Sequence, residues 1–191
     1  ISKSMNFDKF LIMPPAYYKY SDKEVVNFYS RIIDQINECQ IILYNFEKLS
    51  GYKFSVECVE ELVSKFPNQI IGVKDSSYNL YEKLKISNFS VMPGSESKLL
   101  KGLEIGCSGI ITATTNVTAS LAREVFDSFT NKSPQHSNQK LCEVRSSFEK
   151  YNLISGLHTF MSQNNKIFEN ILPPLRLLSD NEKNELLLNL K

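Results

Sequence analysis

The sequence has almost no net charge, no long apolar run and few cysteines or histidines. Its 191 residues carry 22 Lys and Arg against 21 Asp and Glu, which gives a formal net charge of +1. This balance provides no electrostatic reason to expect nucleic acid or an anionic membrane as a partner. No apolar stretch is long enough to span a bilayer and no signal peptide is recognised, so the cytoplasm is the expected location.

Cysteine and histidine patterns typical of metal or redox sites are also missing. The four cysteines are scattered without a Cys-x-x-Cys pair: Cys39, Cys58, Cys107 and Cys142. This spacing suggests neither a zinc site nor a redox motif, and it fits a reducing compartment. His136 and His158 have no metal-ligand neighbour at helical spacing. We therefore expect neither a metal nor another cofactor.

The composition, with 42% hydrophobic and 23% charged residues, is typical of a globular protein with a sizeable core. The first residue is Ile1 rather than methionine, and a strand pattern begins almost at once. We expect the sequence to be a fragment of a longer chain.

Short apolar runs alternate with amphipathic stretches along most of the sequence. Five runs predict buried strands, at residues 10–13, 41–45, 70–75, 89–92 and 109–114. Capping residues and apolar stripes predict helices at 21–36, 55–66, 80–86, 95–103, 118–129, 139–152, 155–169 and 179–190. Strand followed by helix, repeated, indicates a parallel sheet with right-handed crossovers.

The carboxyl ends of parallel strands are where active sites lie in such folds. The polar residues expected there are Tyr17, Tyr44, Lys74, Glu96 and Thr114. No glycine-rich phosphate fingerprint follows any strand, which disfavours a nucleotide-binding doubly wound fold. Five strands cannot close an eight-stranded barrel, and three βα units, about 90 residues, would be missing from its front.

Lys74 ends an apolar run of β-branched residues with no turn residue in between. Among apolar neighbours the neutral amine is favoured, and a neutral lysine can attack a ketone to give a Schiff base. The alternative is an ordinary strand-end lysine that reaches solvent.

Several motifs together resemble the dihydrodipicolinate synthase and N-acetylneuraminate lyase family. They are Pro15-Ala16-Tyr17-Tyr18, Tyr44-Asn45 with Ser50-Gly51, Gly72-Val73-Lys74-Asp75-Ser76, Gly94-Ser95-Glu96, Gly109-Ile110-Ile111 with Asn116, and Leu172-Pro173-Pro174-Leu175. The resemblance implies a TIM (β/α)8 barrel of which strands 4 to 8 are present. Residues 1–130 would form five βα units and residues 131–191 a helical extension.

The resemblance also implies roles for individual residues. Lys74 matches the Schiff-base lysine that holds pyruvate, and Tyr44 matches a tyrosine that shuttles a proton to or from the aldehyde. Tyr17 lies where the synthases place a relay tyrosine contributed across a subunit contact. For both tyrosines the alternative is an amphipathic aromatic at a loop edge. Substrate contacts are implied for Ser76, Gly94, Glu96, Ile111 and Ala113.

Departures from the family pattern bear on the substrate. Leu49 stands where the synthases usually have an arginine that grips the aldehyde's carboxylate. Gly94-Ser95-Glu96 is more similar to aldolases of 2-keto-3-deoxy sugar acids. Glu96-Ser97 and Ala113 differ from the acid pair and the serine that lyases of sialic acid have.

We therefore expect a pyruvate-dependent aldolase acting on such a sugar acid or a sialic-acid-like compound, assembled as a homotetramer. Dihydrodipicolinate synthase of lysine biosynthesis is the enzymatic alternative. A non-catalytic truncated barrel that binds a metabolite or a full-length partner is an alternative from another class.

Overall fold

The computed structural model describes residues 7–36 and 38–190. They divide into two compact units. The first unit runs as far as Gly94 and includes Gly102–Ile110, and the second comprises Ser95–Lys101 and everything from Ile111 onward. The division passes through helix α4 (Leu99–Glu104). These compact units are not sets of βα repeats, so they do not test the expected boundary at residue 130. That boundary stays a prediction.

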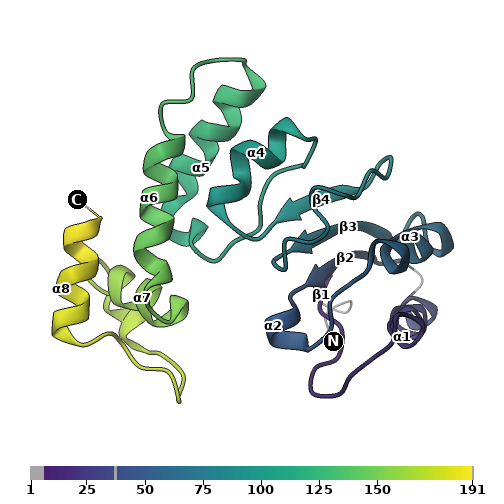
Figure 1. Cartoon of the computed structure of the whole chain (residues 1–191). Coiled ribbons are helices and arrows are strands. Elements are labelled where there is room, and N and C mark those ends of the chain that lie inside the picture. Colours follow the sequence, from purple (N-terminus) through teal and green to yellow (C-terminus); the bar gives the residue numbers. More distant parts are fainter. Residues whose placement is uncertain (1–6, 37, 191) are drawn as a thin grey trace. The chain divides into compact units, whose positions relative to one another are not determined.

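The first unit is built on a four-stranded parallel sheet in the order β1-β2-β3-β4 (Figure 1). The strands are β1 (Lys9–Ile12), β2 (Gln40–Asn45), β3 (Ile70–Asp75) and β4 (Ser90–Pro93). Each strand lies beside its successor in the sequence, which is the order expected for consecutive βα units of a barrel. Four of the expected strands are thus confirmed.

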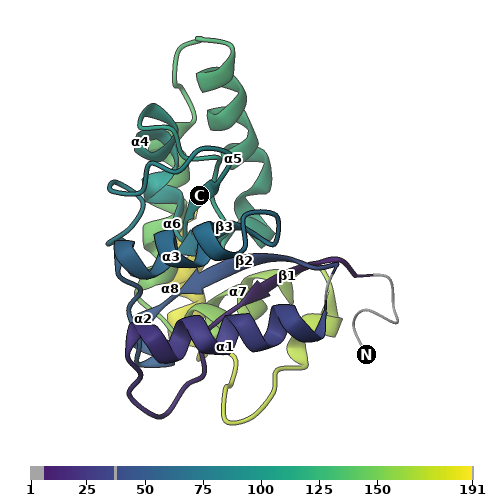
Figure 2. The ribbon, with the colours of Figure 1, turned by 90° about the vertical axis from the view of Figure 1, so that its right-hand side faces the viewer.

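Helices α1 (Asp22–Gln35) and α3 (Val56–Lys65) cover one face of this sheet, with the short α2 (Glu47–Ser50) following β2 (Figure 2). Ser21 and Glu24 form the expected capping box at the start of α1, and Ser55 caps α3. The Tyr29 hydroxyl on α1 donates to the Ile12 carbonyl oxygen at 2.8 Å. This bond ties the helix layer to the first strand.

The alternation of side chains along the strands separates a core face from an opposite face. Leu43 and Val73 are paired in register and are fully buried in the core that α1 and α3 cover. Tyr44 and Lys74, one residue further along, are also register partners, but they are only half-buried. They lie on the opposite face because successive strand side chains point to opposite sides of a sheet.

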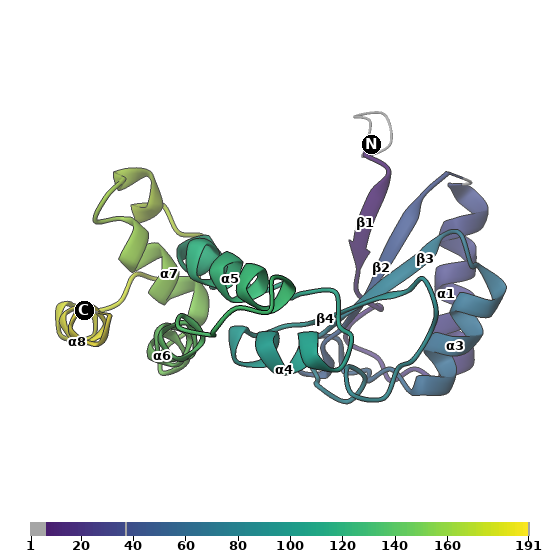
Figure 3. The same cartoon turned by 90° about the horizontal axis from the view of Figure 1, so that it is seen from above.

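The second unit is helical (Figure 3). Its elements are η2 (Glu96–Lys98), α5 (Thr115–Thr130), α6 (Asn138–Glu149), α7 (Leu153–Met161), η3 (Lys166–Glu169) and α8 (Asp180–Asn189). Helix α6 packs against α5, α7 and α8, and a small core of Val144, Phe148, Leu157 and Leu186 lies among them. Within the described residues no helix is long and apolar enough to cross a membrane.

The strand expected at residues 109–114 does not form. The described part of the chain pairs only four strands, and this segment has no regular structure. Gly109 has a φ of +143°, and the Thr115 hydroxyl donates to the Thr112 carbonyl at 2.6 Å, so the backbone turns where a strand would continue. A strand needs a paired neighbour, and residues 109–114 make no ladder with β4.

Two of the expected helices also differ. Residues 80–86 form only a turn, because the Leu80 amide donates to the Asp75 carboxylate and a segment this short gains little as an isolated helix. The helix expected at 155–169 is interrupted after Met161. Asn165 then caps the separate turn η3 with its side chain, which competes with continuation of the helix.

Candidate active site

Tyr44 and Lys74 lie side by side at the carboxyl ends of β2 and β3. The Lys74 Nζ atom lies 4.0 Å from the centroid of the Tyr44 ring. The Tyr44 ring also stacks on Phe46, with 6.0 Å between ring centroids. An amine and a phenol therefore meet at the end of a sheet, the arrangement expected from the two strand motifs.

Asn45 and Asp75 form a second cross-strand pair immediately after the first. They are register partners, both are 0% exposed, and the Asn45 Nδ2 atom donates to Asp75 Oδ1 at 2.8 Å. By strand alternation they occupy the face opposite to Tyr44 and Lys74. A buried polar pair thus lies directly behind the lysine and the tyrosine.

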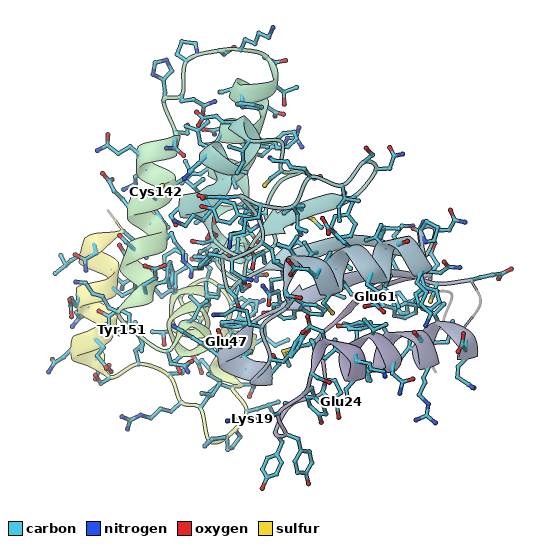
Figure 4. All side chains as sticks on the ribbon, turned by 45° about the vertical axis from the view of Figure 1, so that its right-hand side comes forward. Lys19, Glu24, Glu47, Glu61, Cys142 and Tyr151 are labelled. Carbon is cyan, nitrogen blue, oxygen red and sulfur yellow. The ribbon has the colours of Figure 1, made fainter. Side chains whose placement is uncertain are left out.

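The Asp75 carboxylate organises the loop that follows β3. It accepts hydrogen bonds from the backbone N–H groups of Tyr78, Leu80 and Tyr81, at 2.8–2.9 Å. A hydrogen bond also joins this loop to α2: the Glu47 amide donates to the Ser77 hydroxyl at 2.9 Å. Figure 4 labels Glu47 at the start of α2.

Ser76 and Gly94, both expected to contact substrate, lie next to each other in the first unit. The Ser76 amide extends the ladder by donating to the Asn45 carbonyl at 2.8 Å, and the Gly94 amide donates to the Asp75 carbonyl at 3.0 Å. A Cβ atom on Gly94 would lie 2.2 Å from Ser76 Oγ. Glycine is therefore required here by the close approach of the β3 and β4 strand ends.

Tyr17 lies in the loop after β1 and is almost entirely exposed, at 91%. Its φ of +86° is in the left-handed region, which is unusual for a bulky residue such as tyrosine. Its ring packs edge-on against the ring of Tyr18, with 4.9 Å between the ring centroids. At this exposure it does not pack against Tyr44 or Lys74 within one chain.

Glu96 belongs to the second unit and is fully buried. Its carboxylate accepts hydrogen bonds from the hydroxyls of Thr112 at 3.0 Å and Thr118 at 3.1 Å, and it lies 3.5 Å from Arg145 Nη1. Arg145 Nη1 also donates to Thr114 Oγ1 at 2.7 Å. We call Glu96, Thr112, Thr114, Thr118 and Arg145 the Glu96 cluster.

Ile111 and Ala113 alternate with the two threonines of the Glu96 cluster. Thr112 and Thr114 are buried, whereas Ile111 and Ala113 are half-buried. The cluster therefore determines which side chains of residues 111–114 point inward. A contact of Glu96, Ile111 or Ala113 with substrate stays a prediction.

Two groups of polar residues were not foreseen as parts of a site. Asn45 and Asp75 could have been noticed, because each directly follows a predicted site residue at the end of a strand. Arg145 carries no such signal, since it lies 49 residues from its Glu96 partner. Among the described residues no group of three or more His, Cys, Asp or Glu side chains could hold a metal ion.

Near the start of α3 two buried side chains, Tyr52 and Cys58, have strongly raised pKa values. The Tyr52 hydroxyl donates to Asp22 Oδ1 at 2.7 Å, and burial raises the pKa of Tyr52 far above its ordinary value. Burial likewise raises the pKa of the Cys58 thiol to about 11. Both groups are therefore neutral at physiological pH and serve packing rather than nucleophilic chemistry.

Residues 2–191 match the model of the dihydrodipicolinate synthetase family. The chain is 26% identical over 181 residues to the 2-dehydro-3-deoxy-D-gluconate/2-dehydro-3-deoxy-phosphogluconate aldolase of Picrophilus torridus, covering 91% of this chain and 67% of that protein. It is 28% identical over 127 residues to the N-acetylneuraminate lyase of Clostridium perfringens, covering 64% of this chain and 43% of the lyase.

Solved structures share the fold. The dihydrodipicolinate synthase of Bacillus anthracis superimposes with a TM-score of 0.87 at 21% identity, covering 99% of this chain and 66% of that one. The enzyme of Cyanidioschyzon merolae gives a TM-score of 0.89 at 15% identity, covering 98% and 66%. The chain thus spans about two thirds of the length of these structures. With a family model matched along nearly its whole length, the chain belongs to the dihydrodipicolinate synthetase family.

Proposed function

We propose that the protein is a pyruvate-dependent class I aldolase, which makes or breaks a carbon–carbon bond between pyruvate and an aldehyde. The observation that carries this proposal is the position of Lys74 Nζ, 4.0 Å from the Tyr44 ring at the ends of adjacent parallel strands. Membership of a family whose named relatives include an aldolase and a lyase supports it.

Lys74 is the proposed nucleophile. Its neutral amine adds to the keto carbon of pyruvate, and one proton passes from the nitrogen to the keto oxygen. A second proton, taken from solvent, lets that oxygen leave as water and gives an iminium ion. Loss of a proton from the methyl carbon then gives an enamine, because the iminium nitrogen takes up the electron pair. The enamine carbon adds to the carbonyl carbon of the aldehyde, and hydrolysis of the new iminium releases the product and the free lysine. Cleavage is the same sequence in reverse.

Tyr44 is the proposed general acid and base. In the condensing direction its hydroxyl supplies the proton that the aldehyde oxygen needs as the new bond forms, and in cleavage it removes that proton. Stacking on Phe46 restricts the ring of Tyr44, which suits a group that must hold one position through both half-reactions.

Five further residues are proposed to contact substrate. They are Ser76 and Gly94, at the adjoining strand ends of the first unit, and Glu96, Ile111 and Ala113, in the second unit. The exposed, constrained Tyr17 is proposed to reach a neighbouring subunit, within a tetramer.

The proposed substrate class is a 2-keto-3-deoxy sugar acid. Leu49 on α2 is 58% exposed and offers no charge with which to hold the second carboxylate of an aldehyde such as aspartate semialdehyde. The relative from Picrophilus torridus bears the name of an aldolase of this class. Dihydrodipicolinate synthase, the name that the two solved structures bear, remains the second candidate. It would require another cation in place of the arginine that the synthases usually have.

Borohydride trapping tests the nucleophile. The full-length protein, treated with pyruvate and borohydride near neutral pH, should gain one reduced three-carbon unit, and peptide mapping should find it on Lys74 alone. Lys74→Ala should abolish the adduct, whereas Lys19→Ala, at an exposed lysine labelled in Figure 4, should leave it unchanged.

Tyr44→Phe separates proton transfer from nucleophilic attack. The adduct should still form, while turnover falls by about 10² to 10⁴ because a positioned acid–base group is lost. Turnover is measured as cleavage of 2-keto-3-deoxygluconate and of N-acetylneuraminate and as condensation of pyruvate with aspartate semialdehyde.

Activity in the condensation alone would replace the sugar-acid proposal with the synthase. If the folded protein forms no adduct, or the label lies on another lysine, the aldolase proposal is wrong, and a non-catalytic member of the family is the reading that replaces it.

A further inference from the structure

The polar pair Asn45–Asp75 lies behind the proposed reacting pair and makes no contact that the aldolase chemistry itself requires. We propose that Asn45 and Asp75 are positioning residues, which hold the Tyr44–Lys74 spacing at the value that the reaction needs. This inference rests on the proposed aldolase function and deepens it.

The ladder between β2 and β3 does not by itself secure this spacing. Its register is regular from Ile42 to Asn45, but it shifts between Ile41 and Ile42. Ile41 pairs with Ile70 and Ile42 pairs with Gly72, so β3 has one unpaired residue at this point, and the alignment of the two strands is locally disrupted just before the site. A one-residue slip would exchange the faces of the side chains and remove Tyr44 from Lys74.

The Asn45–Asp75 bond opposes such a slip from the other face of the sheet. The amide and the carboxylate are joined at 2.8 Å across the strands, one residue beyond the reacting pair. Because neighbouring residues share a peptide plane, a fixed Cα position at 45 and 75 restricts residues 44 and 74. The pair therefore acts on the spacing without touching substrate.

The other hydrogen-bonding groups of the Asn45 side chain are also engaged. The second amide hydrogen of Asn45 reaches Asn79 Oδ1 at 2.8 Å, and Asn45 Oδ1 accepts from the Phe54 amide at 3.2 Å. Asn79 in turn donates to the Phe54 carbonyl at 2.9 Å. With the three loop amides bound by Asp75, the network joins both strand ends to the loops that follow them.

Stability alone does not call for such a network at this place. Burying a carboxylate and an amide carries a large desolvation penalty, and an apolar pair of similar volume often gives equal or greater stability. Directional hydrogen bonds instead favour one alignment of β2 with β3, because any other register would leave these buried polar groups unpaired. Alignment of two reacting groups is what an aldolase site needs here.

Two single substitutions test the proposal in the full-length protein. Asn45→Ala removes the cross-strand bond and leaves Asp75 on its three loop amides, so the loop keeps its main anchor. Asp75→Asn replaces one acceptor oxygen by a donor that faces backbone N–H groups. Asp127→Asn, at an exposed residue of α5 paired with Arg123, is the matched control.

The expected result is a loss of kcat with little change in KM. Asn45→Ala should lower kcat by about 10- to 100-fold at a temperature well below its melting point, because a misplacement of about 1 Å can cost about 100-fold. KM for pyruvate should change less than about threefold, and borohydride should still label Lys74. Asp127→Asn should match the parent protein in both measurements.

Exchanging the amide and the carboxylate between positions 45 and 75 should partly rescue the activity. The double variant Asn45→Asp with Asp75→Asn restores an amide–carboxylate bond in the opposite direction and should recover part of the kcat that Asp75→Asn loses. Hydrogen exchange supplies a readout that does not depend on activity: the amides of Tyr78, Leu80 and Tyr81 should exchange faster in Asp75→Asn.

Failure of this inference is distinct from failure of the aldolase proposal. Absence of the adduct in the parent protein overturns the proposed function. A parent that is labelled on Lys74, with an Asn45→Ala variant of lower melting temperature but unchanged kcat, overturns the positioning role and leaves the pair as packing. Unfolding of both single variants overturns it too, because the pair would then be required by the fold as a whole.

Discussion

At the scale of single residues, the carboxyl ends of β3 and β4 leave no room for a further methyl group. A Cβ atom on Gly94 would lie 2.2 Å from Ser76 Oγ and 3.0 Å from Ser76 Cβ. Gly72 is in a similar position, where a Cβ atom would lie 2.6 Å from the Ser90 carbonyl oxygen. Strand β3, which carries Lys74, thus approaches β4 closely because glycine stands at positions 72 and 94.

Gly94→Ala should destabilise the protein by about 1–3 kcal/mol, the usual cost of overpacking a close contact. Adding Ser76→Ala should recover part of this loss by removing the hydroxyl. The control is Gly102→Ala within α4, where the nearest atom is 3.4 Å from the added Cβ and alanine favours the helix, so stability should be unchanged or rise by up to about 1 kcal/mol. Urea unfolding measures all three variants, and equal stabilities of Gly94→Ala and Gly102→Ala would contradict the contact argument.

At the scale of elements, the Glu96 cluster joins η2, the segment 112–114 and α6 within the second unit. Arg145 on α6 has a side chain that is only 13% exposed, and its partner Glu96 is fully buried. Its Nε atom also donates to Glu149 at 2.9 Å on the same helix. The arginine is therefore the cation that compensates a carboxylate removed from water.

Arg145→Met should cost about 3–5 kcal/mol, because it leaves the Glu96 carboxylate buried with hydroxyl partners but no counter-charge. Arg123→Met provides the surface comparison and should cost far less, since the Arg123–Asp127 pair on α5 is exposed and screened by solvent. Combining Arg145→Met with Glu96→Gln should restore much of the loss. Chemical unfolding tests this order, and a similar cost for both arginine variants would refute the proposed compensation.

At the scale of the whole molecule, several buried acidic groups hold their protons in the folded state. Burial raises the pKa of Tyr29 well above its ordinary value, and it raises that of the Cys58 thiol from 9.0 to about 11. An unfolded chain gives up these protons more readily. The Cys58 thiol therefore contributes stability that is fully present below about pH 9 and is lost as the pH rises toward 11, whereas the contribution of Tyr29 is lost only above its ordinary pKa of about 10.

The free energy of unfolding should fall between pH 9 and 10.5, with Cys58 alone contributing a slope of up to about 1.4 kcal/mol per pH unit. Cys58→Ala should flatten this slope by up to that amount, whatever its effect on stability at pH 7. Cys142→Ala, at a thiol whose pKa burial also raises, should flatten it less, because this side chain is only half-buried whereas Cys58 is buried. Parallel pH curves for the parent and Cys58→Ala would show that the thiol does not titrate as inferred.

The sequence by itself determined the strands at 10–13, 41–45, 70–75 and 89–92, the capped helices and the meeting of Tyr44 with Lys74. These features follow from local periodicity, capping residues and the parallel order of consecutive βα units, all of which are written in neighbouring residues. The family motifs added the expectation of a lysine nucleophile, and the family itself is confirmed.

Tertiary structure alone decided the features that depend on distant partners. The expected strand at 109–114 fails because β-structure requires a paired neighbour, and the expected helix at 80–86 gives way to bonds with the Asp75 carboxylate. The partnership of Arg145 with Glu96 likewise has no local signal. Local patterns specify which conformations a segment favours, but burial and hydrogen-bond pairing across the fold determine which of them is kept.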